Sequence, residues 1–246
     1  PFLVGGILST GTTVTRTEQR GGTAQLAHEA APFGHRNHLV GGGEFIRNNF
    51  TNSLTAFSDF GPFANRTISE ESNIAGYVQD SFYLLSNLIV TGGARYDWTK
   101  VDADSLDSFG TVTKGALRYH RTTMRGGITY LATDNVSAYY NYSEGFRVPT
   151  TLEMFTLTGQ PNLNLRPIRS RNHEIGLKGR FGALAEGSVA LFYNNSNDIF
   201  FTCNSCDPFN LAFDGQNRNA DEVRRQGVEV TLKSRWSEYL DGIVNY

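Results

Sequence analysis

The sequence predicts an all-β protein, a transmembrane antiparallel β-barrel, on three grounds: residue alternation, loop lengths and composition. Stretches of about ten residues alternate apolar and polar side chains, as in a barrel strand with lipid on one side and water on the other. Very short polar turns and long connections follow each other in strict succession along the chain. Glycine makes up 26 of 246 residues and aromatic residues 12%, a composition that favours strands joined by many turns.

Residues 88–99 show the alternation most clearly. One face carries Leu88, Val90, Gly92, Ala94, Tyr96 and Trp98, and the other carries Ile89, Thr91, Gly93, Arg95, Asp97 and Thr99. The same division separates Met124, Ile128 and Tyr130 from Thr123, Arg125 and Thr129, and Ile175, Leu177 and Phe181 from Glu174, Lys178 and Arg180. It recurs where Val228, Val230 and Leu232 alternate with Glu229, Thr231 and Lys233. We expect the first face of each set to meet lipid.

About ten strands long enough to cross a bilayer are expected. In chain order they are 21–30, 37–48, 73–83, 88–101, 117–131, 136–145, 171–181, 187–200, 222–235 and 240–246. The expected short turns are 31–36, 84–87, 132–135, 182–186 and 236–239, and the long connections are 49–72, 102–116, 146–170 and 201–221. Residues 1–20 are expected to hold the end of an earlier strand and its loop. The outward face of 73–83 stays open, because Asp80 shares a face with Ile74 and Val78.

Charge and hydropathy narrow the class of protein. Twenty-two basic residues against 24 acidic residues leave no electrostatic footprint for a nucleic-acid partner. A mean hydropathy of -0.34 and the lack of an apolar run of about 18 residues argue against a membrane-spanning helix, whereas barrel strands average out as mildly hydrophilic. Aromatic residues near the expected strand ends would form interfacial girdles; they are Tyr83, Tyr96, Trp98, Tyr130, Tyr142, Tyr193, Phe200, Trp236 and Tyr239.

Six segments in order resemble the TonB-dependent receptors of Gram-negative outer membranes, in the middle of their barrel. They are residues 33–44, 77–82, 93–97, 143–149, 161–167 with 174–178, and 225–230. The resemblance implies that residues 1–246 are part of a barrel of about 22 strands, plugged by an N-terminal domain. The plug and the closing strands are expected to lie outside this chain. In such a receptor, TonB and its inner-membrane motor proteins pull on the plug to drive import.

The resemblance also implies a substrate class and a location. The complete protein would sit among outer-membrane lipids, bind a small-molecule metal chelate and import it without cofactor or bond chemistry, so that no enzyme activity or catalytic residue is expected. A ferric siderophore is preferred because it is the commonest substrate of the family; cobalamin, a glycan or another metal stays open. Haem is disfavoured, because haem receptors usually carry a His in the segment that corresponds to 146–167, and this segment has none.

The candidate ligand-binding residues are aromatic or carry a guanidinium group: Phe146, Arg147, Phe155, Arg166, Phe200 and Phe201. Stacking and charge together could hold an anionic chelate. The alternative for the first pair is structural, with Pro149 setting the angle at which the chain leaves its strand.

Four charged residues are candidates to line the passage or grip the plug: Arg95, Arg125, Lys178 and Glu229. The alternative is that they form ladders between neighbouring strands. Cys203 and Cys206 are a disulfide candidate in an external loop, because two thiols alone lack the second pair of ligands that a metal site needs.

Three other function classes stay in view. A barrel without an upstream plug would be a passive porin. A barrel-embedded hydrolase would need a hydrogen-bonded Ser and His in the lumen, and a soluble all-β binding domain would stay in the aqueous phase on detergent partition.

Overall fold

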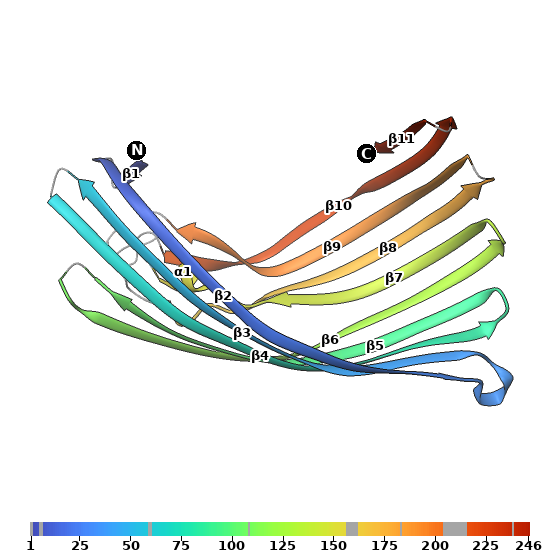
Figure 1. The fold of residues 1–246 in the computed structure, drawn as a ribbon, viewed down its shortest axis with the longest axis horizontal. Helices are drawn as coiled ribbons and strands as arrows, with labels where there is room; N and C mark the ends of the chain where they lie inside the picture. The colour runs from blue at the N-terminus through green and yellow to red at the C-terminus, as the bar shows by residue number, and fades with distance from the viewer. Residues whose placement is uncertain are drawn as a thin grey trace.

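The computed structural model describes residues 2–4, 7–58, 61–107, 109–155, 162–182, 184–203, 216–237 and 239–246. Eleven strands form one sheet in which each strand pairs antiparallel with its neighbours in chain order. The sheet curves into an open trough, and the short turns lie together at one end (Figure 1). Such a trough is a segment of a barrel wall, so the predicted all-β barrel fold is confirmed.

The strand bounds in chain order are β1 (Phe2–Val4), β2 (Ile7–Ala30), β3 (Asn37–Ser58), β4 (Gly61–Leu85), β5 (Leu88–Leu106), β6 (Val112–Thr133), β7 (Val136–Arg147), β8 (Ile168–Phe181), β9 (Ala185–Cys203), β10 (Gln216–Ser237) and β11 (Leu240–Asn245). Two short helical elements lie among the described residues: η1 (Pro32–Gly34) and α1 (Thr151–Met154). No helix among the described residues has the length and apolar character that a membrane crossing needs.

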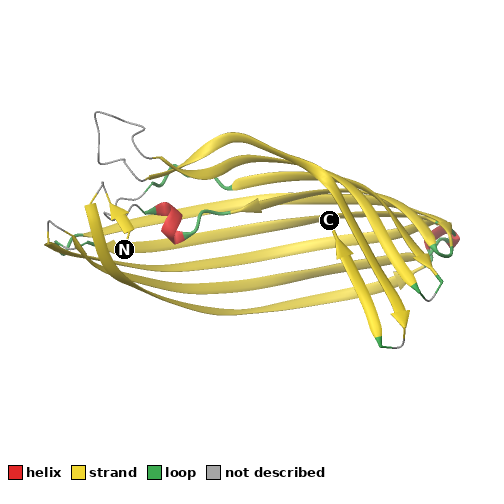
Figure 2. Ribbon diagram, turned by 90° about the horizontal axis from the view of Figure 1, so that it is seen from above, coloured by secondary structure: helices red, strands yellow, loops and turns green. Residues whose placement is uncertain are grey.

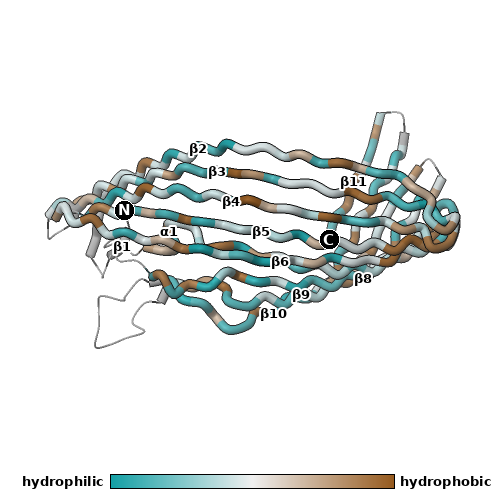
Figure 3. Tube along the Cα trace, turned by 90° about the horizontal axis from the view of Figure 1, so that it is seen from below, coloured by the Kyte–Doolittle hydropathy of each residue, from teal (hydrophilic) through white to brown (hydrophobic). Residues whose placement is uncertain are grey.

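Alternation assigns an outer face and an inner face to the sheet. On β5, Val90, Tyr96 and Trp98 are 38%, 50% and 38% exposed on the outer face, while Asp97 and Thr99 are 3% and 1% exposed on the inner face. Hydrophobic and hydrophilic residues alternate along the strands, and hydrophobic residues are densest towards the end with the short turns (Figure 3). The predicted division of residues 88–99 into an apolar outer face and an inner face with the polar residues is therefore confirmed.

The outward face of the strand at 73–83 is now assigned. Ile74 and Val78 are 52% and 48% exposed, so Asp80 lies with them on the outer face. Its carboxylate accepts a hydrogen bond of 2.6 Å from the Asn37 side chain on β3, near the short turns. This bond supplies a polar partner for a charge close to the membrane boundary.

The prediction that residues 49–72 and 102–116 form long connections is wrong. Most of their residues extend β3, β4, β5 and β6 well past the membrane-crossing part, leaving only residues 59–60 and 107–111 between the strands. Beyond the bilayer the outer face of a hairpin meets water instead of lipid, so the apolar outer row that marks a membrane-crossing strand ends while the backbone ladder continues. Polar cross-strand contacts replace it, as in the hydrogen bond of 2.8 Å from Thr15 to Asn52.

The remaining expectations on connections hold in part. Residues 7–20 are strand rather than loop, and β1 supplies the end of an earlier strand. The connection after β7 spans residues 148–167 and contains α1. Of the expected connection at 201–221, residues 216–221 belong to β10 and residues 204–215 lie outside the described residues.

Candidate functional site

A short helix begins directly after β7, at the end of the trough opposite the short turns (Figure 2). The ring of Pro149 fixes the φ angle of that residue, and Thr150 stands at the N-cap of the helix. A threonine at the N-cap favours the start of a helix. Glu153 accepts hydrogen bonds from the Thr150 backbone N–H at 2.7 Å and from its hydroxyl group at 2.9 Å, within a capping box. The local sequence Thr-x-x-Glu therefore positions α1.

Two apolar side chains anchor α1 against the inner wall. Met154 and Phe155 are 0% and 8% exposed and pack on residues of β5 and β6. The buried cluster consists of Val101, Ala103, Leu117, Met154 and Phe155. Tyr119 packs against it and donates a hydrogen bond of 2.8 Å to the Leu165 carbonyl oxygen. The connection thus folds into the trough, and we call its described residues, 148–155 and 162–167, the inner loop.

Asparagine side chains tie the inner loop to β10. Asn217 donates to the Glu153 carbonyl oxygen at 3.1 Å, and Asn162 donates to the Asn217 carbonyl oxygen at 2.7 Å. Asn219 accepts from the Arg166 backbone N–H at 2.9 Å and donates to the Arg166 carbonyl oxygen at 2.8 Å. The inner loop is thereby held between β5–β6 on one side and β10 on the other, across the trough.

Arg166 pairs with a carboxylate of the wall, while 60% of its own side chain stays exposed. Its Nη2 lies 2.6 Å from Oδ1 of Asp198, which is 9% exposed. Asp198 has a φ of 62°, a left-handed conformation that Asp tolerates better than most residues. Asn219 also donates to the Asp198 carbonyl oxygen at 2.7 Å. These contacts fasten the end of the inner loop to β9 and leave Arg166 with a neutralised charge.

Arg147 joins the inner loop to β9. Its Nη1 and Nη2 each lie 2.8 Å from a Glu153 carboxylate oxygen, a bidentate ion pair. The guanidinium carbon lies 5.0 Å from the centre of the Phe200 ring, within cation–π range. The Arg147 side chain keeps 47% of its surface exposed. Two of the predicted ligand-binding residues are therefore in contact, with guanidinium surface still open.

Two hollows on the inner wall lie between this contact and the short turns. The hollow nearer to the contact, about 380 Å³, is lined by Glu71, Asn73, Arg95, Asp97, Thr99, Thr123, Gly145, Phe146, Arg147 and Val148. The second, about 450 Å³, is lined by Glu44, Tyr77, Gly93, Ala94, Arg95, Thr123, Met124, Arg125, Ser143 and Glu144. Because both include Arg95 and Thr123, they adjoin, and together they bring four predicted residues, Phe146, Arg147, Arg95 and Arg125, onto one stretch of wall.

Arg95 forms a ladder across three strands. Its Nε donates to both carboxylate oxygens of Asp97 at 3.0 Å, and its Nη2 donates to Glu44 on β3 at 2.6 Å. Asn73 of β4 donates to Asp97 at 3.2 Å. This geometry supports the alternative in which Arg95 forms a polar ladder between neighbouring strands, because two carboxylates within the wall balance its charge.

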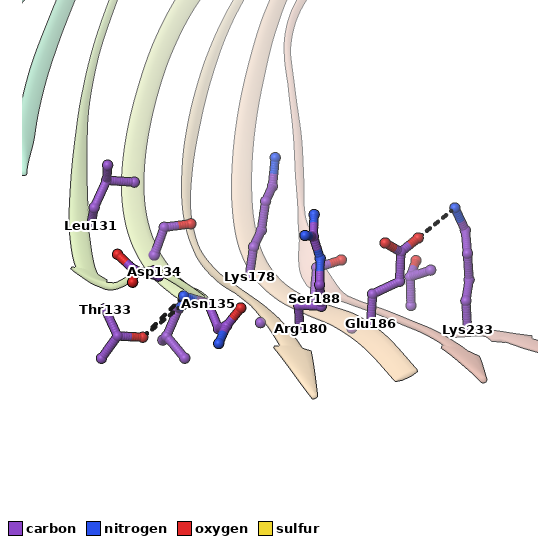
Figure 4. Close-up of a pocket in the computed structure, with 14 residues that line it drawn as sticks. Leu131, Thr133, Asp134, Asn135, Lys178, Arg180, Glu186, Ser188 and Lys233 are labelled. Atoms are coloured by element: carbon purple, nitrogen blue, oxygen red, sulfur yellow. Dashed lines mark hydrogen bonds and ion pairs between the residues drawn. The ribbon is translucent and has the colours of Figure 1, made fainter. Parts of the chain in front are cut away.

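Lys178 and Glu229 lie nearer the short turns. A third hollow of about 390 Å³ there is lined by Lys178, Arg180 and Lys233, among others; Figure 4 shows the first two on β8 and Lys233 on β10, with side chains of β9 between them. The Lys178 Nζ lies 4.7 Å from the centre of the Tyr139 ring, and Lys233 pairs with Glu186 at 3.1 Å. Glu229 is exposed on β10, opposite Ala190 of β9.

The other predicted site residues have different surroundings. Phe155 lies in the buried cluster, so its ring contacts protein rather than the hollows. Phe201 is 44% exposed on β9. Cys203 ends β9, but its side chain and all of Cys206 lie outside the described residues, and the disulfide stays a prediction.

The Glu153 carboxylate has a lowered pKa. Burial acts to raise this pKa, but the hydrogen bonds from Arg147 and Thr150 outweigh burial and hold the pKa below its ordinary value of 4.5. A carboxylate whose pKa is lowered on folding stabilises the folded loop above its ordinary pKa. The contribution is lost as the pH falls from about 4.5 through the lowered value.

Acidification should therefore loosen the inner loop. In the full-length receptor, hydrogen exchange of peptides covering 148–155, corrected for the intrinsic rate, is expected to stay slow at neutral pH and to rise as the pH falls below 4.5. Glu153→Gln removes the titrating group, so this variant should lose the acid-induced rise. An equal rise in the variant would show that Glu153 is not the group responsible.

Sequence reasoning missed the residues that hold the inner loop. Glu153, Asp198 and Asn219 make its main polar contacts, but none was a candidate. The capping-box pattern of Thr150 and Glu153 directly after Pro149 was a usable signal for the helix. No local signal marks the other two residues, because Asp198 of β9 and Asn219 of β10 come near Arg166 only once the sheet has formed.

The chain belongs to the family described as TonB dependent receptor-like, beta-barrel, whose model matches residues 4–246. It is thus part of an outer-membrane receptor barrel, and the predicted family and location are confirmed.

Two curated relatives are named as transporters. The chain is 28% identical over 192 residues to the ferrichrome outer membrane transporter/phage receptor of Escherichia coli K12, covering 76% of this chain and 22% of that protein. It is also 28% identical over 193 residues to a vitamin B12 transporter of Photobacterium profundum, covering 78% and 27%. The chain therefore spans about a quarter of the length of these two relatives.

A solved structure has the same fold. The ferric yersiniabactin uptake receptor of Yersinia pestis superposes with a TM-score of 0.76 at 17% identity, over 96% of this chain and 35% of that chain.

Proposed function

We propose that the complete protein imports a ferric siderophore across the outer membrane, driven by TonB through an N-terminal plug domain. The contact of Arg147 with Phe200, above a hollow lined by Phe146 and Arg95, carries the proposal. A guanidinium group with an aromatic face beside it suits an anionic, ring-bearing iron chelate. The relatives named for ferrichrome and ferric yersiniabactin transport agree with this class of substrate.

The plug is proposed to contact the inner wall between the ligand and the short turns. Arg125 and Lys178 line hollows that open into the trough, and Glu229 is exposed on the same wall. Residues 1–246 would then be one part of a larger plugged barrel. The relative named as a vitamin B12 transporter supports cobalamin as the second candidate substrate.

Uptake by the full-length receptor tests the function. Cells that lack other siderophore receptors would express it with and without TonB, and would be offered radioiron-labelled ferrichrome, a radioiron-labelled ferric catecholate and labelled cobalamin. Accumulation of iron only in the cells with TonB supports the proposal. Cobalamin accumulation alone would replace the substrate, and iron accumulation that ignores TonB would reject active transport in favour of a passive porin.

Replacing Arg147 tests the site itself. Arg147→Gln should weaken binding of the transported chelate about tenfold or more, since hydrogen bonds to charged groups contribute about 1.5–3 kcal/mol. Glu153→Gln keeps the Arg147 guanidinium but weakens its tie to the inner loop, so this variant should weaken binding less than Arg147→Gln does. If both variants weaken binding equally, Arg147 acts only by holding the inner loop. Arg235→Gln, an exposed change near the short turns, controls for net charge.

A further inference from the structure

One carboxylate in the hollow nearer to the contact of Arg147 with Phe200 has no partner. Glu71 of β4 lines this hollow and is partly buried. Its carboxylate makes no hydrogen bond or ion pair with any residue that the structure describes. A charge that is partly removed from water costs free energy unless another group compensates it. An unpaired carboxylate on this wall therefore points to a partner that the ligand supplies.

Glu71 lies beyond the membrane-crossing part of the wall. On the outer face of β4 and β5, Ile74 pairs with Trp98, and the next two outer pairs away from the short turns are polar. Glu71 lies three residues past Ile74 on the inner face. Its neighbour Glu70 forms an ion pair with Arg47 on the outer face. The Glu71 carboxylate is thus at the external end of the trough, where a ligand arrives.

The strand neighbours of Glu71 explain why its carboxylate stays unpaired. In the sheet Glu71 lies opposite Asn48 of β3 and Val101 of β5, and neither residue carries a charge. Val101 is 1% exposed and belongs to the buried cluster that holds Met154. Burial raises the pKa of Glu71 above its ordinary value of 4.5, and no nearby cation opposes this rise. The wall itself therefore does not compensate the charge.

Both guanidinium groups of this hollow already have carboxylate partners. Arg95 pairs with Asp97 at 2.9 Å and with Glu44 at 2.6 Å. Arg147 pairs with Glu153 through two bonds of 2.8 Å. Among the described residues that line the hollow, these two arginines are the only basic ones. The unpaired carboxylate therefore leaves an excess of negative charge in the lining.

A second acceptor without a donor lies beside Glu71 on the inner face of β4. The Asn73 side chain donates from Nδ2 to Oδ1 of Asp97 at 3.2 Å. Because an ionised carboxylate only accepts hydrogen bonds, this bond fixes which end of the Asn73 amide is the oxygen. That oxygen, Oδ1, is buried and has no hydrogen-bond partner among the described residues. The wall at this level offers acceptors and lacks donors.

From these observations we infer that Glu71 is a specificity residue that binds a protonated amine of the imported chelate, an inference that rests on the proposed import of an iron chelate. A primary ammonium group carries one positive charge and three N–H donors. It can therefore pair with the Glu71 carboxylate and also donate to a neighbouring oxygen. A hydroxyl group would supply a donor but no charge to balance the carboxylate.

The substrate class becomes narrower with this assignment. Glu71 and Arg147 line one hollow of about 380 Å³, so a single ligand can reach both. The chelate would place the negatively charged oxygens around its iron near Arg147 and its amine at Glu71. A linear trihydroxamate that ends in a primary amine has both features. A chelate whose amine is acylated leaves the carboxylate unpaired and should bind more weakly.

A matched pair of chelates tests the inference on the wild-type, full-length receptor. One is a linear ferric trihydroxamate with a terminal primary amine, and the other is the same chelate with that amine acetylated, which removes the charge and leaves the iron centre unchanged. We expect the purified receptor to bind the amine form about tenfold more tightly or better, because a charge-assisted hydrogen bond is lost with the acetylated form. Equal binding of the two forms, tighter binding of the acetylated form or binding of neither form would overturn the inference.

Variants locate the preference at Glu71. Glu71→Gln keeps the size of the side chain and removes its charge, so the affinity ratio of the two chelates should fall to about one. Glu70→Gln is the matched control, because it removes the same charge from the adjacent residue on the outer face and should keep the wild-type ratio. A ratio of two affinities does not depend on how much of each variant folds. An unchanged ratio in Glu71→Gln, or an equal loss in Glu70→Gln, would contradict the role of Glu71.

The uptake experiment separates a failure of this inference from a failure of the proposed function. TonB-dependent accumulation of iron from a chelate without an amine, combined with no preference for the amine form in binding, would reject the role of Glu71 and leave iron import standing. No accumulation of iron from any of the chelates, the amine form included, would reject both.

Discussion

Replacement of Met154 by Ala is expected to release the inner loop from the wall while leaving the barrel folded. Met154 is 0% exposed and is the largest fully buried side chain described. Removing such a side chain typically costs about 2–5 kcal/mol, because apolar contacts are lost and a cavity remains. Here the cost falls on one loop, because the strands on either side keep their own backbone ladders. The local opening equilibrium of the inner loop should therefore shift by more than tenfold.

Limited proteolysis of the full-length receptor measures this release. The Met154→Ala protein should be cut within residues 148–167 much faster than wild type, while its unheated barrel still migrates as the folded form. Leu152→Ala is the matched control, because Leu152 lies on the same helical turn but is 52% exposed. Met154→Leu conserves volume and should restore most of the protection. Equal cleavage of the Ala variants at 152 and 154 would contradict the role given to the buried cluster.

The sequence predicted the membrane-crossing wall well because lipid imposes a pattern. Where one face meets hydrocarbon, alternation is obligatory, and Tyr96 and Trp98 lie outward as predicted while Asp97 lies inward. Beyond the bilayer this constraint ends. The hairpin of β3 and β4 continues there through polar residues such as Asn52 and Thr67, both buried among strand neighbours. Alternation could not reveal these extensions, and residues 49–72 were therefore predicted as a connection.

The inner loop shows a different limit. Its aromatic and charged residues were recognisable, but their partners come from distant strands. Phe155 packs on β5 and β6 and Arg166 pairs with Asp198 of β9, so neither role is encoded near the residue itself. Arg147 is different, because its partner Glu153 lies only six residues away and follows a capping pattern. Local pairs can be predicted from one sequence, whereas pairs that depend on sheet register cannot.

Adjacent glycines on β3 should respond oppositely to the same substitution. A Cβ atom on Gly42 would lie 2.6 Å from the Ala24 carbonyl oxygen and 2.6 Å from the Tyr77 hydroxyl oxygen, on the inner face. Tyr77 is held across this glycine by its hydrogen bond of 3.1 Å to Gln25 on β2. A Cβ atom on Gly41 would meet only the Tyr77 carbonyl oxygen, at 3.7 Å, on the lipid-facing side. Only the inner position lacks room for a side chain.

Gly42→Val should therefore disrupt the wall between β2, β3 and β4, whereas Gly41→Val should be tolerated. Overpacking typically costs about 1–3 kcal/mol, and the cost rises when the obstructing atom is backbone, which cannot move aside as a side chain can. Valine at 41 adds an apolar group facing lipid and restricts the unfolded chain, which favours a strand by about 0.5–1 kcal/mol. The fraction of full-length receptor that resists unfolding on unheated electrophoresis, and its thermal midpoint, should fall for Gly42→Val and stay level or rise for Gly41→Val. A fall of equal size in both variants would mean that both positions need glycine for backbone freedom. Lack of space beneath Tyr77 affects position 42 alone, so it could not explain an equal fall.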